Sequence, residues 1–426
     1  MSGDGATPRL DGSHRQVVVV GGGQAGLSMS YHLGRYEVDH LVLEQNTVGH
    51  EWRERRWDSF CLVTPNWQCQ LPGFPYAGDD PHGFMDKDEI IEYLEGFAEF
   101  VDAPLVEGVK VTALTRGERG GFEVETSAGE LTADQVVVAT GGYHHPQIPR
   151  RAERFPDSIV QLHSSQYRDA ESLPDGEVMV IGTGQSGGQV AEDLHLAGRR
   201  VHLCVGGAPR TARFYRARDV TDWLADMGHY DLPVDEHPSG ERIRLQRNHY
   251  VTGRGGGRDI DLRQFALEGM RLYGRLEAVE GATLRFSPDL RENLDHADEV
   301  SESIKAGIDK HIEAEAVSAP EEAGYTPVWE PEEEPREIDL ERERISTVIW
   351  STGFVRDFGW IDAPAFDGRG EPKHHRGVTD VEGLFFVGLP WMHTWGSGRF
   401  SGVARDAEHL AGRIRARIEQ RGFALA

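Results

Sequence analysis

A glycine-rich hexapeptide stands twice in this chain between a short apolar run and a helix-like segment. The first copy, residues 21–26 (Gly-Gly-Gly-Gln-Ala-Gly), follows the β-branched run 17–20. The second, residues 182–187 (Gly-Thr-Gly-Gln-Ser-Gly), follows the run 178–181, 161 positions later (182 minus 21). Glycines let the backbone turn tightly and approach a pyrophosphate, whose charge faces the free N–H groups of the helix. One such loop is a common turn, but two in this setting predict two βαβ units that bind dinucleotides.

The residue after the next strand distinguishes the two predicted sites. Glu44 follows Gly26 by 18 positions (44 minus 26). A carboxylate there accepts hydrogen bonds from the ribose of an adenosine without a 2′-phosphate, so the first loop is expected to hold FAD or NAD. The second unit has no acid after its strand 201–205, but Arg210 and Arg213 follow. Guanidinium groups suit a 2′-phosphate, which predicts NADPH on the second loop.

Apolar periodicity predicts the remaining elements. Asp86 and Glu89 form a capping box that opens a helix with Ile90, Leu94 and Phe97 on one face. Further strands are predicted at residues 109–114, 121–126, 135–139, 346–350 and 384–387. Further helices are predicted around residues 300–312 and over 402–418.

The formal net charge of −26 disfavours nucleic acid and anionic membranes as partners. Residues 289–343 carry 19 acidic and 5 basic side chains, so they predict an acidic insert that is either a solvated surface insertion, the favoured reading, or a cap over a substrate pocket. The stretch 242–263 contains six arginines. These either bind a substrate carboxylate or, as we favour, pair with the acidic insert.

No apolar run approaches the roughly 18 residues of a membrane span, and the N-terminal residues lack the apolar core of a secretory signal. A cytoplasmic protein is therefore expected. The histidines show no ligand pattern, so no metal site is expected. Three cysteines, none in a Cys-x-x-Cys pair, predict neither a disulfide framework nor a redox-active dithiol.

Further motifs resemble those of the flavoproteins with two dinucleotide-binding domains. Residues 139–141 (Ala-Thr-Gly) and 351–353 (Ser-Thr-Gly) each end a predicted strand, and Gly388 follows another. This group includes disulfide reductases, amine oxidases and single-component monooxygenases. The missing Cys-x-x-Cys pair argues against the first of these.

Within that group, the chain resembles the bacterial flavin-containing monooxygenases. The matching positions are Trp52, Arg53, 56–59 (Arg-Trp-Asp-Ser), 64–66 (Thr-Pro-Asn), 71–75 (Leu-Pro-Gly-Phe-Pro), His163, Tyr167, 388–391 (Gly-Leu-Pro-Trp) and 396–399 (Gly-Ser-Gly-Arg). The family fingerprint departs at one place, since Phe155 is followed by Asp157 where the family has glycine, and His163 comes two places late. Tyr167 stands where the Baeyer–Villiger version has tryptophan, so ester-forming oxygenation of ketones is less expected.

The resemblance implies an α/β fold of two Rossmann-like dinucleotide-binding domains, with the NADPH domain inserted in the FAD domain. The division is a disordered leader at 1–15, an FAD-binding domain at 16–160 and 345–426, an NADPH-binding domain at 161–288 and an acidic helical insert at 289–344.

The same resemblance implies an NADPH- and O2-dependent monooxygenase. NADPH would reduce FAD, the reduced flavin would form a C4a-hydroperoxide with O2, and one oxygen would pass to a small soft nucleophile, expected to contain nitrogen. A flavin oxidoreductase or oxidase without oxygen transfer is the first alternative, and a non-catalytic redox sensor is the second. The expected partners are the substrate and O2, and a homodimer is left open.

The loops and the resemblance together imply a set of site residues. Asn66 is the catalytic candidate, placed to hydrogen-bond the oxygenated flavin or the nicotinamide. His163 is expected to brace the hinge between the domains, with proton transfer as the alternative. The cofactor-binding residues are Gly21, Gly23, Gln24, Ala25, Gly26, Glu44, Gln45, Trp52, Arg53, Trp57, Thr64, Ala139, Thr140, Gly141, Gly182, Gly184, Gln185, Ser186, Gly187, Arg210, Arg213, Thr352, Gly353 and Gly388.

Overall fold

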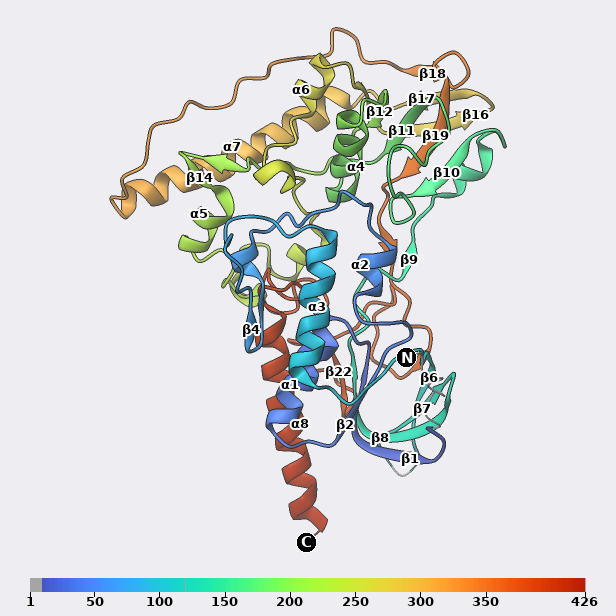
Figure 1. Ribbon diagram of the computed structural model, residues 1–426, viewed down its shortest axis with the longest axis vertical. Coiled ribbons are helices and arrows are strands. Elements are labelled where there is room, and N and C mark those ends of the chain that lie inside the picture. The colour runs from blue at the N-terminus through green and yellow to red at the C-terminus, as the bar shows by residue number, and fades with distance from the viewer. Residues whose placement is uncertain (1–9, 119, 426) are drawn as a thin grey trace.

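Each predicted βαβ unit has its own sheet in the computed structural model, which describes residues 10–118 and 120–425 (Figure 1). The strands of the first sheet are β1 (Ser13–Val20), β2 (His40–Leu43), β5 (Leu105–Val106), β6 (Val111–Arg116), β7 (Phe122–Thr126), β8 (Gly129–Val138), β21 (Ile361–Asp362) and β22 (Leu384–Phe386). β1 lies between β2 and β8, all parallel, and β5 and β22 extend this parallel part. β6 and β7 form an antiparallel meander with the first half of β8, and β21 adds to β6.

The second sheet repeats this plan. Its strands are β10 (Val160–His163), β11 (Glu177–Ile181), β12 (Val201–Cys204), β15 (Arg271–Tyr273) and β19 (Ile345–Trp350). They are all parallel, in the order β10-β19-β11-β12-β15. A separate antiparallel meander contains β16 (Leu276–Glu280), β17 (Thr283–Phe286) and β18 (Glu337–Asp339). β18 leads into β19, so β19 corresponds to the second half of β8.

The described residues form eight α-helices, of which the sequence predicted the five longest and missed the three at residues 50–54, 220–226 and 262–267. They are α1 (Gln24–Arg35), α2 (His50–Glu54), α3 (Lys87–Val101), α4 (Gln185–Leu196), α5 (Val220–Asp226), α6 (Leu262–Leu267), α7 (Leu290–Ala314) and α8 (Val403–Leu425). α1, α3 and α8 share a core with one face of the first sheet, and the meander covers the other face. The capping box of Asp86 and Glu89 is confirmed. Among the described residues, none of the helices is long and apolar enough to cross a membrane.

The structure differs from the expected division at two places. The first strand was expected at Val17, after a leader, but β1 begins at Ser13, because residues 13–15 pair with β8. Residues 10–12 of the predicted leader are also placed, with Leu10 buried, and residues 1–9 lie outside the described residues. Strand β19, assigned above to the FAD domain, hydrogen-bonds to β10 and β11 in the second sheet. An apolar run does not indicate which sheet its strand will join. The sequence alone therefore could not place the domain boundary at this strand.

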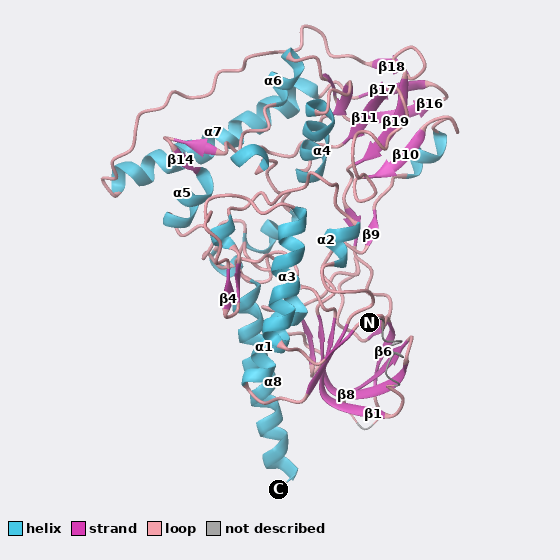
Figure 2. Cartoon of the chain, viewed as in Figure 1, coloured by secondary structure: helices cyan, strands magenta, loops and turns pink. Residues whose placement is uncertain are grey.

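The acidic insert packs on the second unit through α7. Ile308 and Ile312 are buried against Trp223, as the stripe predicts. Residues 316–336 form a long loop without helix or strand (Figure 2). On α7, Asp298 accepts from the Nε atoms of Arg210 at 2.6 Å and Arg263 at 2.8 Å.

Both arginines are almost fully buried, with side chains 3% and 2% exposed. Burial alone would lower their pKa values, but Asp298 raises the pKa of Arg210 and of Arg263 above the usual value. The acidic insert therefore pairs with the basic stretch at Arg263, as favoured above. Arg254 and Arg258 of the same stretch instead pair with α4, at Asp193 and Glu192.

We predict that Asp298→Asn lowers the free energy of unfolding by about 3 kcal/mol, because it leaves two buried guanidinium groups short of a carboxylate. Urea denaturation measures the change. Asp295→Asn is the matched control, since that carboxylate also contacts Arg263 but is 51% exposed. It should cost less than about 1 kcal/mol. Equal losses in the two variants would contradict this account.

Candidate active site at the junction of the two units

One cavity of about 1580 Å³ lies where the two units meet, and both glycine loops line it. Nineteen of the predicted cofactor residues line it: Gly21, Gly23, Gln24, Ala25, Glu44, Gln45, Trp52, Trp57, Thr64, Ala139, Thr140, Gly141, Gly182, Gly184, Gln185, Ser186, Thr352, Gly353 and Gly388. No residue of the acidic insert 289–344, all of which is described, lines the cavity. The insert is therefore not its cap in this structure.

The first loop brings α1 very close to the strand before it. Gly21 has a φ of +112°, and a Cβ there would lie 2.6 Å from the Ala139 carbonyl oxygen. A Cβ on Gly26 would lie only 1.8 Å from the Gly21 oxygen. Gly23 precedes α1, faces open space and offers no side-chain cap to the first N–H groups of the helix. These N–H groups are left for an anion in the cavity.

The second loop has nearly the same geometry. Gly182 has a φ of +103°, and a Cβ there would lie 2.7 Å from the Ser351 oxygen. A Cβ on Gly187 would lie 1.9 Å from the Gly182 oxygen. Gly184 precedes α4 and again provides no side-chain cap. The segments 139–141 and 351–353 are thus equivalent, each beside one loop.

The carboxylate of Glu44 marks the first loop. It accepts hydrogen bonds from the Gly22 and Asn46 amides, each at 2.8 Å, and it lines the cavity. In the pairing register, Leu43 lies opposite Val20 as Cys204 lies opposite Ile181. The residue equivalent to Glu44 is therefore Val205, which leaves the second loop without a carboxylate at this position.

The structure does not bring Arg210 and Arg213 into the cavity. Arg210 is held by Asp298, as described above. Arg213 is 2% exposed, donates to the Val63 carbonyl at 2.7 Å and lies 3.3 Å from Asp219. Both guanidinium groups are bound by other residues of the protein, so we do not assign them to the 2′-phosphate of NADPH.

Another arginine, Arg247, lies in the cavity near the second loop. It is exposed, lines the cavity, and its Nη1 lies 3.9 Å from where a Cβ of Gly206 would be. Gly206 follows β12 and is tied to Thr183 of the second loop by hydrogen bonds. Within residues 10–118 and 120–425, no carboxylate forms an ion pair with Arg247. The sequence gave no local signal for it, because it lies far from β12 along the chain.

Four further predicted site residues lie outside the cavity lining: the glycines Gly26 and Gly187 at the helix–strand contacts described above, and Asn66 and Arg53. Asn66 is buried, donates to the Asp80 oxygen at 3.0 Å and accepts from the Met85 amide at 2.7 Å. Both the nitrogen and the oxygen of its side-chain amide are therefore hydrogen-bonded to the surrounding loop. We do not assign Asn66 to catalysis. Arg53 donates to Glu95 of α3 at 2.6 Å.

Aromatic rings line the cavity beside the first loop. Trp52 stacks on Phe400 with 5.8 Å between ring centroids, and Trp57 meets Phe60 edge-on at 5.0 Å. Thr64 and Gly388 complete the predicted residues of this region. A planar, apolar ring system would be shielded from water here.

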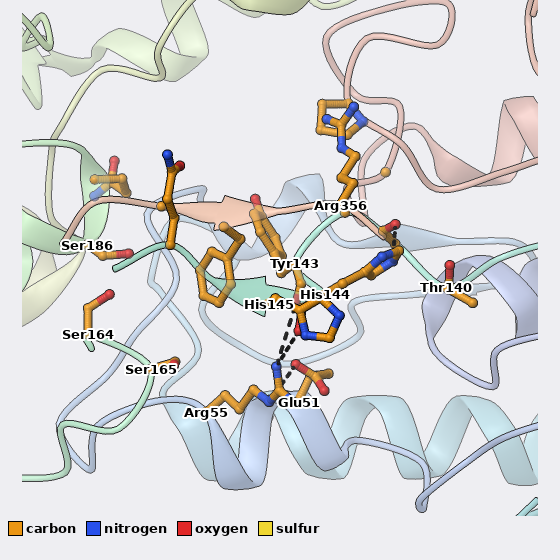
Figure 3. Close-up of a pocket in the computed structure, with 18 of the residues that line it drawn as sticks. Glu51, Arg55, Thr140, Tyr143, His144, His145, Ser164, Ser165, Ser186 and Arg356 are labelled. Atoms are coloured by element: carbon orange, nitrogen blue, oxygen red, sulfur yellow. Dashed lines mark hydrogen bonds and ion pairs between the residues drawn. The ribbon is translucent and has the colours of Figure 1, made fainter. Parts of the chain in front are cut away.

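Two segments of the chain pass from one unit to the other beside the cavity. They contain β9 (His145–Pro146) and β20 (Phe354–Val355), which pair with each other. Figure 3 shows Arg55, Tyr143 and His144 at this crossing, where Arg55 donates to the His144 oxygen at 3.3 Å. His163 is buried, its Nε2 lies 3.0 Å from the Gly353 oxygen, and its ring contacts Phe354. These contacts favour the bracing role predicted for His163.

The three cysteines are separate, buried thiols. Burial raises the pKa of Cys61 to about 11 and that of Cys69 to about 12, and it raises the pKa of Cys204 further. None is therefore a reactive thiolate near neutral pH.

Comparison with known proteins agrees with this architecture. The profile of the family described as pyridine nucleotide-disulphide oxidoreductase matches residues 18–251. The "Uncharacterized oxidoreductase CzcO-like" of Geobacillus kaustophilus (strain HTA426) is 32% identical over 92% of this chain and 96% of its own. The indole-3-pyruvate monooxygenase YUCCA1 of Oryza sativa subsp. japonica is 30% identical over 44% of this chain and 47% of its own. A flavin-containing monooxygenase structure from Stenotrophomonas maltophilia shares the fold, with a TM-score of 0.64 and 18% identity over 95% of this chain and 99% of its own.

Two glycines of the first loop should respond differently to a methyl group. We predict that Gly26→Ala prevents folding or lowers Tm strongly, because its Cβ would overlap the Gly21 oxygen. Gly23→Ala should keep the Tm of the protein without cofactor but lose bound flavin, because its methyl enters the phosphate cradle. Flavin-to-protein ratio and thermal melting measure both effects. Gly34→Ala, on the same helix with nothing within 4 Å, should change neither.

Proposed function

This chain belongs to the pyridine nucleotide-disulphide oxidoreductase family, and from that premise we propose that it is an NADPH- and O2-dependent flavoprotein monooxygenase. It is an FAD-dependent oxidoreductase whose cofactors are FAD and NADPH. The observation that carries the proposal is that two phosphate cradles, one with a carboxylate beside it and one without, open into a single cavity.

The residues present fit both cofactors. Gly21, Gly23 and the start of α1 would hold the FAD pyrophosphate, with Glu44 on the adenosine ribose. Gly182, Gly184 and the start of α4 would hold the NADPH pyrophosphate. When bound, the two cofactors supply hydride transfer and the activation of O2, which the protein's side chains do not provide themselves.

The protein's own contribution is placement and exclusion of water. Trp52, Trp57 and Phe400 give the inner cavity apolar walls, which limit the access of water to a reactive oxygen species. β9 pairs with β20 where the chain passes between the units, and the contacts of Arg55 with His144 and of His163 with Gly353 support that pairing, which would limit changes in the separation of the two cradles. A fixed separation is what transfer between two bound cofactors requires.

Oxygen transfer is favoured over disulfide chemistry, although the family name includes the latter. The three cysteines are buried, none belongs to a Cys-x-x-Cys pair, and their raised pKa values keep them protonated at neutral pH. They therefore cannot relay electrons to a disulfide. We propose a small soft nucleophile as substrate, with a nitrogen-containing molecule as the first class to test. Relatives named as monooxygenases support oxygen transfer.

Purified protein tests the proposal directly. It should be yellow, release FAD on denaturation and oxidise NADPH in air. After anaerobic reduction by NADPH and mixing with O2, a transient absorbance should precede the spectrum of oxidised flavin. Substrate should then gain one oxygen atom, seen by mass spectrometry with ¹⁸O2. NADPH oxidation that yields only hydrogen peroxide with every amine and thioether tested would instead favour an oxidase.

The structure also predicts which arginine selects NADPH. Arg247→Ala should raise the KM for NADPH about tenfold or more, because a charge-assisted contact to the 2′-phosphate is worth about 1.5–3 kcal/mol. The KM for NADH should change by less than about twofold, since NADH lacks that phosphate. Arg210→Ala is the matched control, and it should lower Tm without changing the ratio of the two KM values. Equal losses for both nucleotides in Arg247→Ala would overturn the assignment.

A further inference from the structure

A turn at residues 57–60 carries two of the aromatic rings that line the cavity. The Phe60 amide donates to the Trp57 carbonyl at 3.1 Å, and the two rings meet edge-on at 5.0 Å. The turn lies between α2 and α3 of the first unit, but Trp57 is buried in the hydrophobic core of the second unit. We call residues 57–64 the wall segment, because its members that line the cavity are Trp57, Phe60, Leu62, Val63 and Thr64.

A carboxylate of the second unit is bonded to the middle of this turn. Asp193 lies on α4, is 6% exposed, and accepts from the Ser59 hydroxyl at its Oδ1. The same oxygen accepts from Arg254 Nη1 at 2.5 Å, and Oδ2 accepts from the Tyr167 hydroxyl at 2.6 Å. Burial and the hydrogen bond to Asp193 raise the pKa of Tyr167, so its phenol stays a donor near neutral pH. Of these three donors, Ser59 is the one that comes from the first unit.

Two more side chains of the second unit bind the far end of the wall segment. Arg213 donates to the Val63 carbonyl at 2.7 Å. Asp222 of α5 accepts from Trp67 Nε1 at 2.8 Å. The second unit therefore holds this stretch of the first unit's chain at residues 59, 63 and 67, and the wall segment cannot move freely with the first unit alone.

The pair of Ser59 and Asp193 can act on the site only through its neighbours. Both residues are described, and neither lines the cavity. Helix α4, however, begins at the cradle proposed for NADPH, where Gln185 and Ser186 line the cavity. Asp193 follows Gln185 by eight residues (193 minus 185), which is about 12 Å along the helix. One helix therefore connects the second phosphate cradle to the rings of the wall segment.

We propose that Asp193 is a positioning residue, which sets Trp57 and Phe60 beside the flavin through its hydrogen bond with Ser59. This inference rests on the proposed function and deepens it, because the helix that holds NADPH then also fixes a wall that keeps water from the flavin. A buried hydrogen bond to a charged group is directional and strong, so it selects one position of the turn. Ring packing alone is less directional.

Paired hydroxyl deletions test this inference. Asp193→Ala would also leave Arg254 without its carboxylate, so the smaller changes Ser59→Ala and Tyr167→Phe are compared. Each removes one hydroxyl from the same carboxylate, but only the Ser59 hydroxyl belongs to the wall segment. In FAD-bound Ser59→Ala, hydrogen–deuterium exchange at the amides of residues 57–64 should become about tenfold faster, because the lost bond favours local opening. In Tyr167→Phe this exchange should change by less than about twofold.

The bound flavin reports where the rings lie. Ser59→Ala should alter the visible circular dichroism of FAD, Tyr167→Phe should leave it unchanged, and Ser59→Thr, which keeps a hydroxyl, should restore most of the native spectrum. Support requires that Ser59→Ala changes both exchange and dichroism and that Tyr167→Phe changes neither.

Any other pattern refutes the inference. Faster exchange with a native spectrum, for example, would mean that Asp193 only stabilises the fold. A protein that binds FAD but forms no transient with O2 defeats the proposed function alone, since exchange and dichroism can still be compared. If the native protein binds no FAD, the proposed function fails, and exchange at residues 57–64 alone decides whether Asp193 holds the wall segment.

Discussion

The close approach of a helix to the strand before it is the contact on which both units depend. Gly26 and Gly187 touch the carbonyl oxygens of Gly21 and Gly182, where any side chain would overlap them. This contact brings the start of α1 and of α4 to the cavity with free N–H groups. The negative phosphates of two dinucleotides can thereby be held in a protein of net charge −26, without a general positive field.

The distribution of ion pairs then decides which cations remain for ligands. Carboxylates of helix α7 form buried ion pairs with Arg210 and Arg263, and carboxylates of helix α4 form ion pairs with Arg254 and Arg258. Of the arginines that line the cavity, four form no ion pair with a carboxylate of residues 10–118 and 120–425: Arg56, Arg151, Arg247 and Arg399. The proposed selection of NADPH by Arg247 thus depends on the same distribution of ion pairs that stabilises the second unit.

Local pattern predicted the five longest helices and the central strands of both sheets, because apolar periodicity and capping are properties of neighbouring residues. It missed the short helices and many short strands. The loops, the capping box at Asp86 and the predicted strands lie where the sequence placed them, although β8 begins six residues before the predicted start at 135. The insert helix, predicted around residues 300–312, begins ten residues earlier at Leu290. The predictions that failed needed distant partners. Asn66 was expected to reach the cofactor, but its amide is used by Asp80 and Met85.

The sequence by itself determined the two phosphate cradles, since glycine spacing and the acid at Glu44 are set within one βαβ unit. Only the tertiary structure decided that β19 belongs to the second sheet and that Arg210 is withdrawn from the cavity while Arg247 faces it. The reason is physical. The position of a charged side chain depends on which carboxylate it pairs with in the folded protein. Arg210 pairs with Asp298, which is 88 residues away in the sequence.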